Sequence, residues 1–311
     1  MSDLAIATRQ LTKTYSRTEV VNNIDLRVEK GSVYGLVGRN GAGKTTLLKM
    51  LLGLVRPTAG SLNVLGMDYL HERLAILRRT AYVSESKALF DTMTGEDLVR
   101  FNRSYFSTWS DDAVRKYVKS LQVPMNRVFR NMSSGDKTKL CAVLALAQGA
   151  DLIILDEPFQ GLDPAARDEL HRILIEDYIG GNCTILTSSH QLNELEQIAD
   201  WIGIIDAGHL LLEGRLDDIK GNFRRIVASG TDLSHFRNQE VVGATPFEGL
   251  WQFVVRKDAD EVAQQLRSNG AVVLEILSMS LQEIFLACIR KEELCTSPSA
   301  GETPASVSSR S

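Results

Sequence analysis

The chain has 311 residues, a hydrophobic fraction of 44%, a charged fraction of 24% and a formal net charge of −4. This length suffices for one full α/β domain with an addition, and the composition is that of a globular protein with a large core. The acidic balance argues against a sequence-independent polyanion binder, which needs a basic surface to displace counterions. We therefore expect no nucleic-acid partner.

The chain shows neither a targeting segment nor a membrane span. Its first ten residues lack a basic region followed by an apolar core, so no signal peptide is expected. The most apolar stretch, Cys141 to Leu155, is interrupted by Gln148 and Asp151 and is short of the roughly 20 residues that cross a bilayer. The four cysteines have no metal-ligand spacing, which is typical of reduced thiols in the cytosol.

Strand and helix patterns alternate through the first two thirds of the chain. Alternating polar and apolar residues predict strands over Leu4 to Tyr15 and Val20 to Val28. An apolar run over Gly31 to Val37 leads through a glycine-rich loop into a helix over Thr45 to Leu54. Further strands are predicted over Leu152 to Leu155 and Thr184 to Thr187. This order favours a mainly parallel sheet.

The composition divides the chain into three parts. We expect a first domain over residues 1–217, with a mostly helical subdomain over about residues 88–147 in which Ser110 begins a helix. Residues 218–290 predict a small α+β domain, with strands over 251–256 and 272–277 and helices over 259–268 and 281–290. Residues 291–311 are rich in Ser and Pro, and we expect this tail to be disordered.

A phosphate-binding loop is the strongest motif. It fits G-x-x-x-x-G-K-[ST] between a strand and a helix, where glycines let backbone N–H groups and the helix N-terminus face phosphate oxygens. Lys44 is expected to reach the β- and γ-phosphates, the Thr45 hydroxyl to bind magnesium, and Thr46 to add a phosphate contact. The predicted loop comprises Gly38, Arg39, Asn40, Gly41, Ala42, Gly43, Lys44 and Thr45. We therefore predict ATP and Mg²⁺ as ligands.

Two carboxylates follow a buried strand. The four apolar residues Leu152 to Leu155 precede Asp156 and Glu157. Open α/β sheets bind ligands at the carboxyl ends of their strands, so both side chains are expected near the phosphates. Asp156 suits a direct or indirect role in magnesium binding, and Glu157 can polarise an attacking water. A solvated acidic turn is the alternative, which the preceding phosphate loop disfavours.

In the order of its motifs, the segment from about Leu4 to Gly214 resembles the ABC ATPase family. The segment over Asn131 to Lys137 is similar to the family's signature, with Met132, Ser134 and Asp136 in place of the usual Leu, Gly and Gln. The resemblance implies that Ser133, Ser134 and Gly135 contact the γ-phosphate bound by a facing subunit. A serine and backbone amides at a helix N-terminus do form an anion site, although a Ser-Ser-Gly helix cap is also a common structural feature.

The resemblance implies roles for four more residues. Asp163, in Gly161-Leu162-Asp163, resembles part of the loop that crosses the dimer interface. His190 resembles the histidine that contacts the γ-phosphate and supports the water beside Glu157. Tyr15 stands where the family stacks an aromatic ring on adenine, although it also suits a half-buried strand. Glu85 replaces the family's glutamine, which binds magnesium and forms a hinge toward the membrane subunit. A carboxylate can bind magnesium but repels a γ-phosphate more than an amide does.

The implied fold is a P-loop ABC ATPase with a mainly parallel core sheet, an antiparallel β subdomain, a helical subdomain and a small C-terminal α+β extension. The implied function is ATP binding and hydrolysis for a transporter, with Lys44, Glu157 and His190 as catalytic residues. The implied partners are a separate transmembrane permease and a second ATPase subunit, as a homodimer or a heterodimer. The expected location is therefore cytoplasmic, on the inner face of the membrane.

The resemblance is greatest to export-type subunits, and the segment over residues 278–286 is similar to their ends. It extends to a subgroup associated with antibiotic or peptide export and with acetoin-utilisation operons. The alternative functions are a non-transport ATPase associated with ribosomes or DNA, and a nucleotide-gated regulatory module with little turnover.

Overall fold

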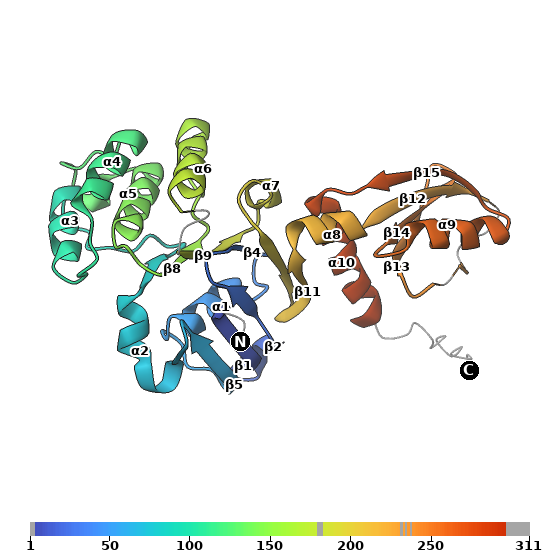
Figure 1. The fold of residues 1–311 in the computed structure, drawn as a ribbon, viewed down its shortest axis with the longest axis horizontal. Coiled ribbons are helices and arrows are strands. Elements are labelled where there is room, and N and C mark those ends of the chain that lie inside the picture. The colour runs from blue at the N-terminus through green and yellow to red at the C-terminus, as the bar shows by residue number, and fades with distance from the viewer. Residues whose placement is uncertain (1–3, 179–182, 231–232, 234, 237, 297–311) are drawn as a thin grey trace, which may run out of the picture. The chain divides into compact units, whose positions relative to one another are not determined.

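The computed structural model describes residues 4–178, 183–230, 233, 235–236 and 238–296. The chain forms two compact units, Met1–Ile219 and Lys220–Ser311 (Figure 1). The boundary that the sequence predicts after residue 217 falls inside helix α8 (Leu216–Asn222). Each unit has its own sheets and its own buried core.

A six-stranded sheet forms the centre of the first unit. Its strands lie in the order β11-β10-β4-β9-β8-β7, and every neighbouring pair is parallel except β10 and β11. The sequence prediction of a mainly parallel core sheet is confirmed. All residues of β4 and β8 are buried, as expected for strands covered on both faces. The strands are β4 (Val33–Gly38), β7 (Thr80–Val83), β8 (Leu152–Asp156), β9 (Thr184–Ser189), β10 (Trp201–Asp206) and β11 (His209–Arg215).

An antiparallel sheet packs beside the first helix, α1 (Lys44–Leu51), and provides the predicted β subdomain. Strand β1 pairs with β2, β3 and β5, and β5 pairs with β6. The strand predicted over residues 20–28 is divided into β2 and β3 by a break at residues 25 and 26, and Asn23, with a φ of +48°, lies within β2 just before that break. The strands are β1 (Leu4–Tyr15), β2 (Thr18–Ile24), β3 (Arg27–Glu29), β5 (Ala59–Val64) and β6 (Met67–Asp68).

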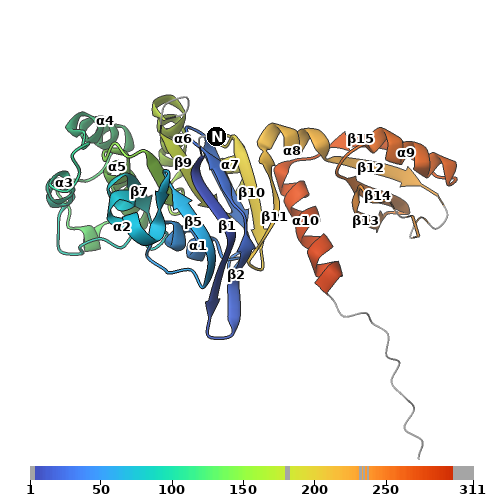
Figure 2. The ribbon, with the colours of Figure 1, turned by 60° about the horizontal axis from the view of Figure 1, so that its bottom comes forward.

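Helices α3, α4 and α5 form the predicted helical subdomain, next to β7 in Figure 2. The Ser110 hydroxyl accepts a hydrogen bond from the Ala113 N–H at 3.1 Å, so Ser110 caps α4 as predicted. Helix α5 is buried on most of its surface and carries the core of this region. The helices and the short 3₁₀ turn η1 of this unit are α2 (Tyr69–Arg78), α3 (Gly95–Arg103), α4 (Asp111–Leu121), η1 (Phe129–Asn131), α5 (Ser134–Leu146), α6 (Pro164–Asp177) and α7 (Leu192–Leu195).

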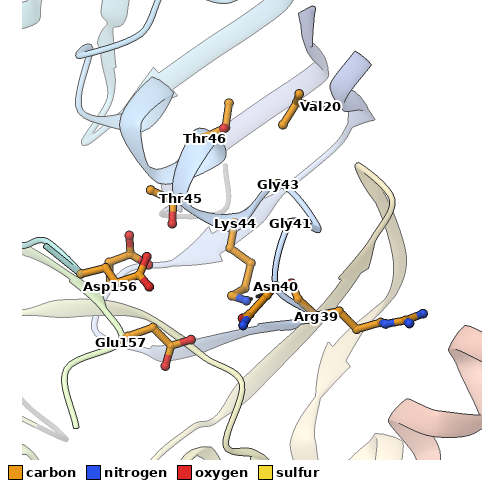
Figure 3. Close-up of a pocket in the computed structure, with 11 residues that line it drawn as sticks. Val20, Arg39, Asn40, Gly41, Gly43, Lys44, Thr45, Thr46, Asp156 and Glu157 are labelled. Atoms are coloured by element: carbon orange, nitrogen blue, oxygen red, sulfur yellow. Dashed lines mark hydrogen bonds between the residues drawn. The ribbon is translucent and has the colours of Figure 1, made fainter. Parts of the chain in front are cut away.

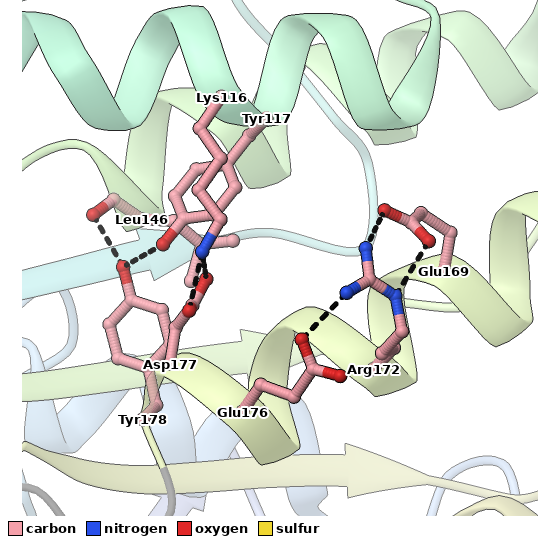
Figure 4. A network of polar contacts seen from close by, with 8 residues as sticks. All are labelled: Lys116, Tyr117, Leu146, Glu169, Arg172, Glu176, Asp177 and Tyr178. Atoms are coloured by element: carbon pink, nitrogen blue, oxygen red, sulfur yellow. Dashed lines mark hydrogen bonds and ion pairs between the residues drawn. The ribbon is translucent and has the colours of Figure 1, made fainter.

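A polar network joins the helical subdomain to α6 (Figure 4). The Lys116 ammonium of α4 contacts both carboxylate oxygens of Asp177, at 2.6 and 2.7 Å. The Tyr178 hydroxyl, just after α6, donates to the Leu146 carbonyl at the end of α5 at 2.7 Å. The Tyr117 hydroxyl lies 3.4 Å from that of Tyr178. These contacts hold together α4, α5 and α6, of which α5 precedes β8 in the chain and α6 follows it.

The second unit is a four-stranded antiparallel sheet in the order β13-β14-β12-β15. Helix α9 packs on β12 and β15 and closes an apolar core around Phe253 and Ile226. The elements are β12 (Arg224–Ser229), β13 (Val241–Phe247), β14 (Leu250–Val255), α9 (Ala259–Ser268), β15 (Val272–Ser278) and α10 (Leu281–Thr296). Residues 291–296 of the predicted tail belong to α10, and residues 297–311 lie outside the described part of the chain.

Within the described ranges, no helix combines the length and the apolar character that crossing a bilayer requires.

Candidate functional site: a phosphate loop facing two carboxylates

The loop between β4 and α1 is shaped by glycines. Gly41 and Gly43 have φ values of +84° and +104°, which residues other than glycine rarely adopt. A Cβ on Gly43 would lie 2.4 Å from the carbonyl oxygen of Val20, so this position also excludes a side chain by contact. The chain can therefore curl tightly before α1 and direct backbone N–H groups inward.

The loop lines a cavity of about 340 Å³. Figure 3 shows the loop residues on one side of this cavity and two carboxylates on the other. The lining residues are Val20, Arg39, Asn40, Gly41, Gly43, Lys44, Thr45, Thr46, Glu85, Asp156 and Glu157. The structure thus brings together most of the predicted phosphate and magnesium residues.

The Lys44 ammonium is held inside its own loop. It donates to the carbonyl oxygens of Gly38 and Arg39, at 2.7 and 3.3 Å. Burial lowers the pKa of Lys44, and the carboxylates of Glu157, Asp156 and Glu85 oppose that change. The buried ammonium itself can pair with a polyphosphate.

Asp156 is fully buried at the end of β8. Its Oδ1 accepts a hydrogen bond from the Ser188 hydroxyl of β9 at 2.5 Å, and its Oδ2 is buried and has no hydrogen-bond partner among the described residues. An unpartnered buried carboxylate oxygen is costly unless a cation or a donor approaches it. The group therefore fits the magnesium role that the sequence predicts.

The described residues contain no group of three or more His, Cys, Asp or Glu side chains that could hold a metal ion. The candidate ligands Thr45, Glu85 and Asp156 line the same cavity as the phosphate loop. Magnesium typically binds one or two protein oxygens together with substrate phosphates and water. The three candidate ligands are consistent with such a coordination shell.

Glu157 follows Asp156 in a left-handed conformation, with φ at +52°. Its Oε2 lies 2.9 Å from Nδ1 of His190, which follows β9. Its backbone N–H donates to the Ser188 carbonyl at 3.1 Å. The side chain is 6% exposed and lines the cavity, so it can orient a water molecule there.

The signature segment forms the start of α5. The Ser133 hydroxyl accepts from the Asp136 N–H at 3.0 Å and caps the helix. A Cβ on Gly135 would lie 2.8 Å from the Gly161 carbonyl oxygen, so this turn and the loop before Asp163 are in close contact. Asp163 in turn caps α6 by accepting from the Ala166 N–H at 2.9 Å. Both helix starts therefore depend on the residues that the resemblance assigns to an interface.

Several predicted residues do not line the cavity within this chain. The lining formed by the described residues excludes Tyr15, the turn over residues 133–135, Asp163 and His190. Tyr15 is 45% exposed at the end of β1, with the Lys13 ammonium 4.8 Å from its ring centre. Gly38 and Ala42 shape the loop from behind, because Gly38 provides a carbonyl for Lys44 and Ala42 is buried.

Sequence reasoning missed three residues at the site: Val20, Lys87 and Ser188. Ser188 stands directly opposite Asp156 in the parallel register of β8 and β9, so strand alignment could have found it. The Lys87 ammonium donates to the backbone carbonyl of Glu157 at 3.1 Å. In the sequence, only the closeness of Lys87 to Glu85 could have indicated that it belongs to the site. Nothing in the sequence indicates Val20.

The comparisons with known proteins agree with this geometry. The family profile described as "ABC transporter" matches residues 21–160, and one described as an "AAA domain, putative AbiEii toxin, Type IV TA system" matches residues 125–196. This chain belongs to the ABC transporter ATP-binding proteins. It is an ATP-binding subunit of an ABC transporter and an ABC-type ATPase.

Two relatives are named for antibiotic transport or drug resistance. The bacitracin transport ATP-binding protein BcrA of Bacillus licheniformis is 35% identical, over 89% of this chain and 93% of its own length. The daunorubicin/doxorubicin resistance ATP-binding protein DrrA of Streptomyces peucetius is 33% identical, over 91% of this chain and 92% of its own. A solved structure of an ATP-binding subunit of an ABC transporter matches with a TM-score of 0.64 and 28% identity, over 70% of this chain and 92% of that one.

Proposed function

We propose that this chain hydrolyses ATP to drive an exporter, together with a separate transmembrane permease on the inner face of the membrane. The observation that carries the proposal is the cavity that unites the Gly38–Thr45 loop with Asp156 and Glu157. Export is supported by what the names of BcrA and DrrA say of those proteins. The C-terminal unit belongs to the same resemblance, because DrrA matches 91% of this chain.

The proposed chemistry assigns a role to each side of the cavity. Lys44 and the loop N–H groups hold the phosphates, and Thr45, Asp156 and Glu85 hold Mg²⁺. When bound, Mg²⁺ neutralises charge on the phosphate oxygens. Glu157 orients and polarises the attacking water, and His190 keeps the Glu157 carboxylate in place through its 2.9 Å contact.

We further propose that two ATPase subunits close head to tail over the nucleotides. The support is geometric: Ser133, Ser134 and Gly135 form a helix start suited to an anion, yet they lie outside the lining of the cavity in their own chain. The γ-phosphate bound by one chain would then meet this turn from its partner, which favours the closed dimer while ATP is intact. Tyr15, an exposed residue at the end of β1, is proposed to stack on adenine.

The test is phosphate release by the purified chain with and without its candidate permease, compared with Lys44→Ala and Glu157→Gln. We expect permease-stimulated hydrolysis that both variants lose, with ATP binding retained by Glu157→Gln and lost by Lys44→Ala. Co-purification with the permease separates transport from a ribosome- or DNA-associated ATPase. Binding of ATP without turnover in any condition would contradict the proposal and identify a nucleotide-gated regulatory module.

A further inference from the structure

The imidazole of His190 is only partly packed against the rest of the chain. Its side chain is 43% exposed, and its Nδ1 lies 2.9 Å from Oε2 of Glu157. A ring exposed to this degree is held loosely by its neighbours, so this contact depends on the backbone that carries the ring. The groups that fix the His190 backbone therefore matter to the proposed general base.

A single buried hydroxyl joins the residues on both sides of His190. Ser189 is 1% exposed, and its Oγ accepts a hydrogen bond from the backbone N–H of Gln191 at 3.0 Å. The same hydroxyl donates to Oε2 of Glu194 at 3.4 Å. Ser189 thus closes the turn that carries the histidine and binds this turn to a carboxylate of the short helix α7.

Glu194 is buried and pairs with a cation from another helix. Its Oε1 lies 3.2 Å from Nε of Arg167, as an ion pair without hydrogen-bond geometry. Arg167 belongs to the first turn of α6, where its backbone N–H donates to the Asp163 carbonyl at 3.0 Å. Burial raises the pKa of Glu194, and Arg167 and the Ser189 hydroxyl oppose that change, so both partners favour the carboxylate form.

Fold stability alone does not explain why a carboxylate occupies position 194. A buried ion pair is often no more stabilising than apolar side chains of similar volume. One oxygen of Glu194 contacts Arg167, and the other contacts the hydroxyl next to His190. The ion pair therefore determines where that hydroxyl, and the turn that it closes, are held relative to α6.

We propose that Arg167 and Glu194 are positioning residues for His190. Through the Ser189 hydroxyl they fix the turn that keeps the imidazole at the Glu157 carboxylate. The inference rests on the proposed function of the cavity as an ATP site. The lining that the described residues form includes neither member of the ion pair, so their loss should slow hydrolysis and leave ATP affinity nearly unchanged.

The test measures single-turnover phosphate release at saturating ATP and the Kd of ATP, on the full-length chain and under the conditions in which the wild type turns over fastest. The variants are Arg167→Gln and Glu194→Gln, each alone and combined with His190→Ala. We expect each single substitution to slow phosphate release about fivefold or more and to change the Kd less than about 2-fold, because misplacing a catalytic group costs rate rather than binding.

The His190→Ala background separates positioning from a purely structural role. When the imidazole is absent, neither substitution should slow phosphate release by more than about 1.5-fold further. Urea titration should show the same loss of stability from Glu194→Gln in both backgrounds, because the ion pair is present in both. Equal fold losses of rate in both backgrounds would overturn the proposal, and so would a wild-type rate in either single variant.

Arg172→Gln is the matched control, because Arg172 lies on the same helix and forms ion pairs with Glu169 and Glu176 at 2.6 Å each. It should keep the wild-type rate, and a loss as large as that of Arg167→Gln would overturn the proposal.

If either buried variant fails to fold, Ser189→Ala decides the question, because it removes only the hydroxyl beside His190. It should slow phosphate release about threefold or more when the imidazole is present, and less than about 1.5-fold when it is absent. An unchanged rate, or equal losses with and without the imidazole, would refute the proposal.

Lys44→Ala and His190→Ala separate this inference from the proposed function. A wild-type chain that turns over no faster than Lys44→Ala contradicts the proposed function of the cavity. Turnover that depends on Lys44 but not on His190 contradicts the role of His190 and this inference together. Turnover that depends on both residues, but not on Arg167 or Glu194, contradicts only the inference about the ion pair.

Discussion

Oε2 of Glu157 and Nδ1 of His190 lie 2.9 Å apart, although the two residues follow different strands of the core sheet. The parallel register of β8 and β9 places Asp156 opposite Ser188, so the residues that follow the two strands lie close together. The Glu157 main chain is fixed as well, by the Ser188 carbonyl and the Lys87 ammonium. A carboxylate held in this way has little freedom to move away from an attacking water molecule.

Glu157 and His190 should therefore behave as one unit in hydrolysis. We expect Glu157→Gln to reduce turnover by about 100- to 10,000-fold, the usual contribution of a general base. His190→Ala should reduce it by at least about tenfold, and adding it to Glu157→Gln should cause little further loss. Single-turnover phosphate release at saturating ATP measures all three. Multiplicative losses in the double variant would show that the two residues act independently.

The Ser188 hydroxyl should tune magnesium binding through Asp156. Removing it in Ser188→Ala frees the Asp156 carboxylate from its 2.5 Å hydrogen bond. Supporting partners of metal ligands are typically worth 10- to 100-fold in metal affinity, so we expect the magnesium concentration for half-maximal activity to rise about 10-fold. Magnesium titrations of both ATP binding and hydrolysis report this shift. The exposed Ser61→Ala is the control, and an unchanged magnesium requirement in Ser188→Ala would refute the role.

Gly135→Ala tests the contact between the signature turn and the loop before Asp163. The new Cβ would lie 2.8 Å from the Gly161 carbonyl oxygen, which is main chain and has little room to move. We expect ATP binding by the isolated subunit to persist, because the cavity lining does not include this turn. ATP-dependent dimerisation and turnover should fall about tenfold or more, since a displacement of about 1 Å can cost 100-fold in rate.

Size-exclusion chromatography in the Glu157→Gln background measures that dimerisation. Gly243→Ala is the matched control, because a Cβ there meets nothing within 4 Å. Gly135→Ala dimers as abundant as those of the control would show that the turn is not part of the interface.

The sequence predicts those parts of the fold and site that depend on local pattern. Each of three features can be recognised from a short stretch of sequence by itself: the apolar strand before Asp156, the glycine loop and the Ser110 cap. The division of residues 20–28 into β2 and β3 falls at residues 25 and 26, where the alternation of polar and apolar residues continues without a break. Local pattern therefore leaves that break undetermined.

Most of what the sequence pattern does not reveal consists of contacts between segments that are far apart in the chain. Lys87 reaches Glu157 across 70 positions of sequence, and its lysine type gives no periodic signal. Tyr178 reaches Leu146 in the same way, through a single hydroxyl. Contacts of this kind, between a side chain and a distant backbone carbonyl, need the tertiary arrangement before they can be recognised.

Glu213 should make the stability of the first unit depend on pH. Burial raises the pKa of Glu213 from its ordinary value of 4.5, although the Tyr34 hydroxyl donates to Oε1 at 2.8 Å. A carboxyl whose pKa is higher in the folded state contributes stability below its unfolded pKa, and this contribution is lost as pH rises through the folded pKa. Wild type should thus lose free energy of unfolding relative to Glu213→Gln between pH 4.5 and neutrality. Urea titrations at intervals across that range provide the comparison, and a constant difference would exclude the effect.

The Tyr178 hydroxyl should stabilise the junction between the helical subdomain and α6. In Tyr178→Phe the Leu146 carbonyl loses a 2.7 Å hydrogen bond in a partly buried place, and the Tyr117 hydroxyl loses its neighbour (Figure 4). Leaving such groups unpaired costs about 1–3 kcal/mol, and we expect a loss of about 1–2 kcal/mol in free energy of unfolding by urea titration. Tyr105→Phe, at a side chain that is 65% exposed, should change this free energy by less than about 0.5 kcal/mol. Equal stability of the two variants would show that the hydrogen bonds of the Tyr178 hydroxyl contribute nothing measurable, because the aromatic rings are preserved in both.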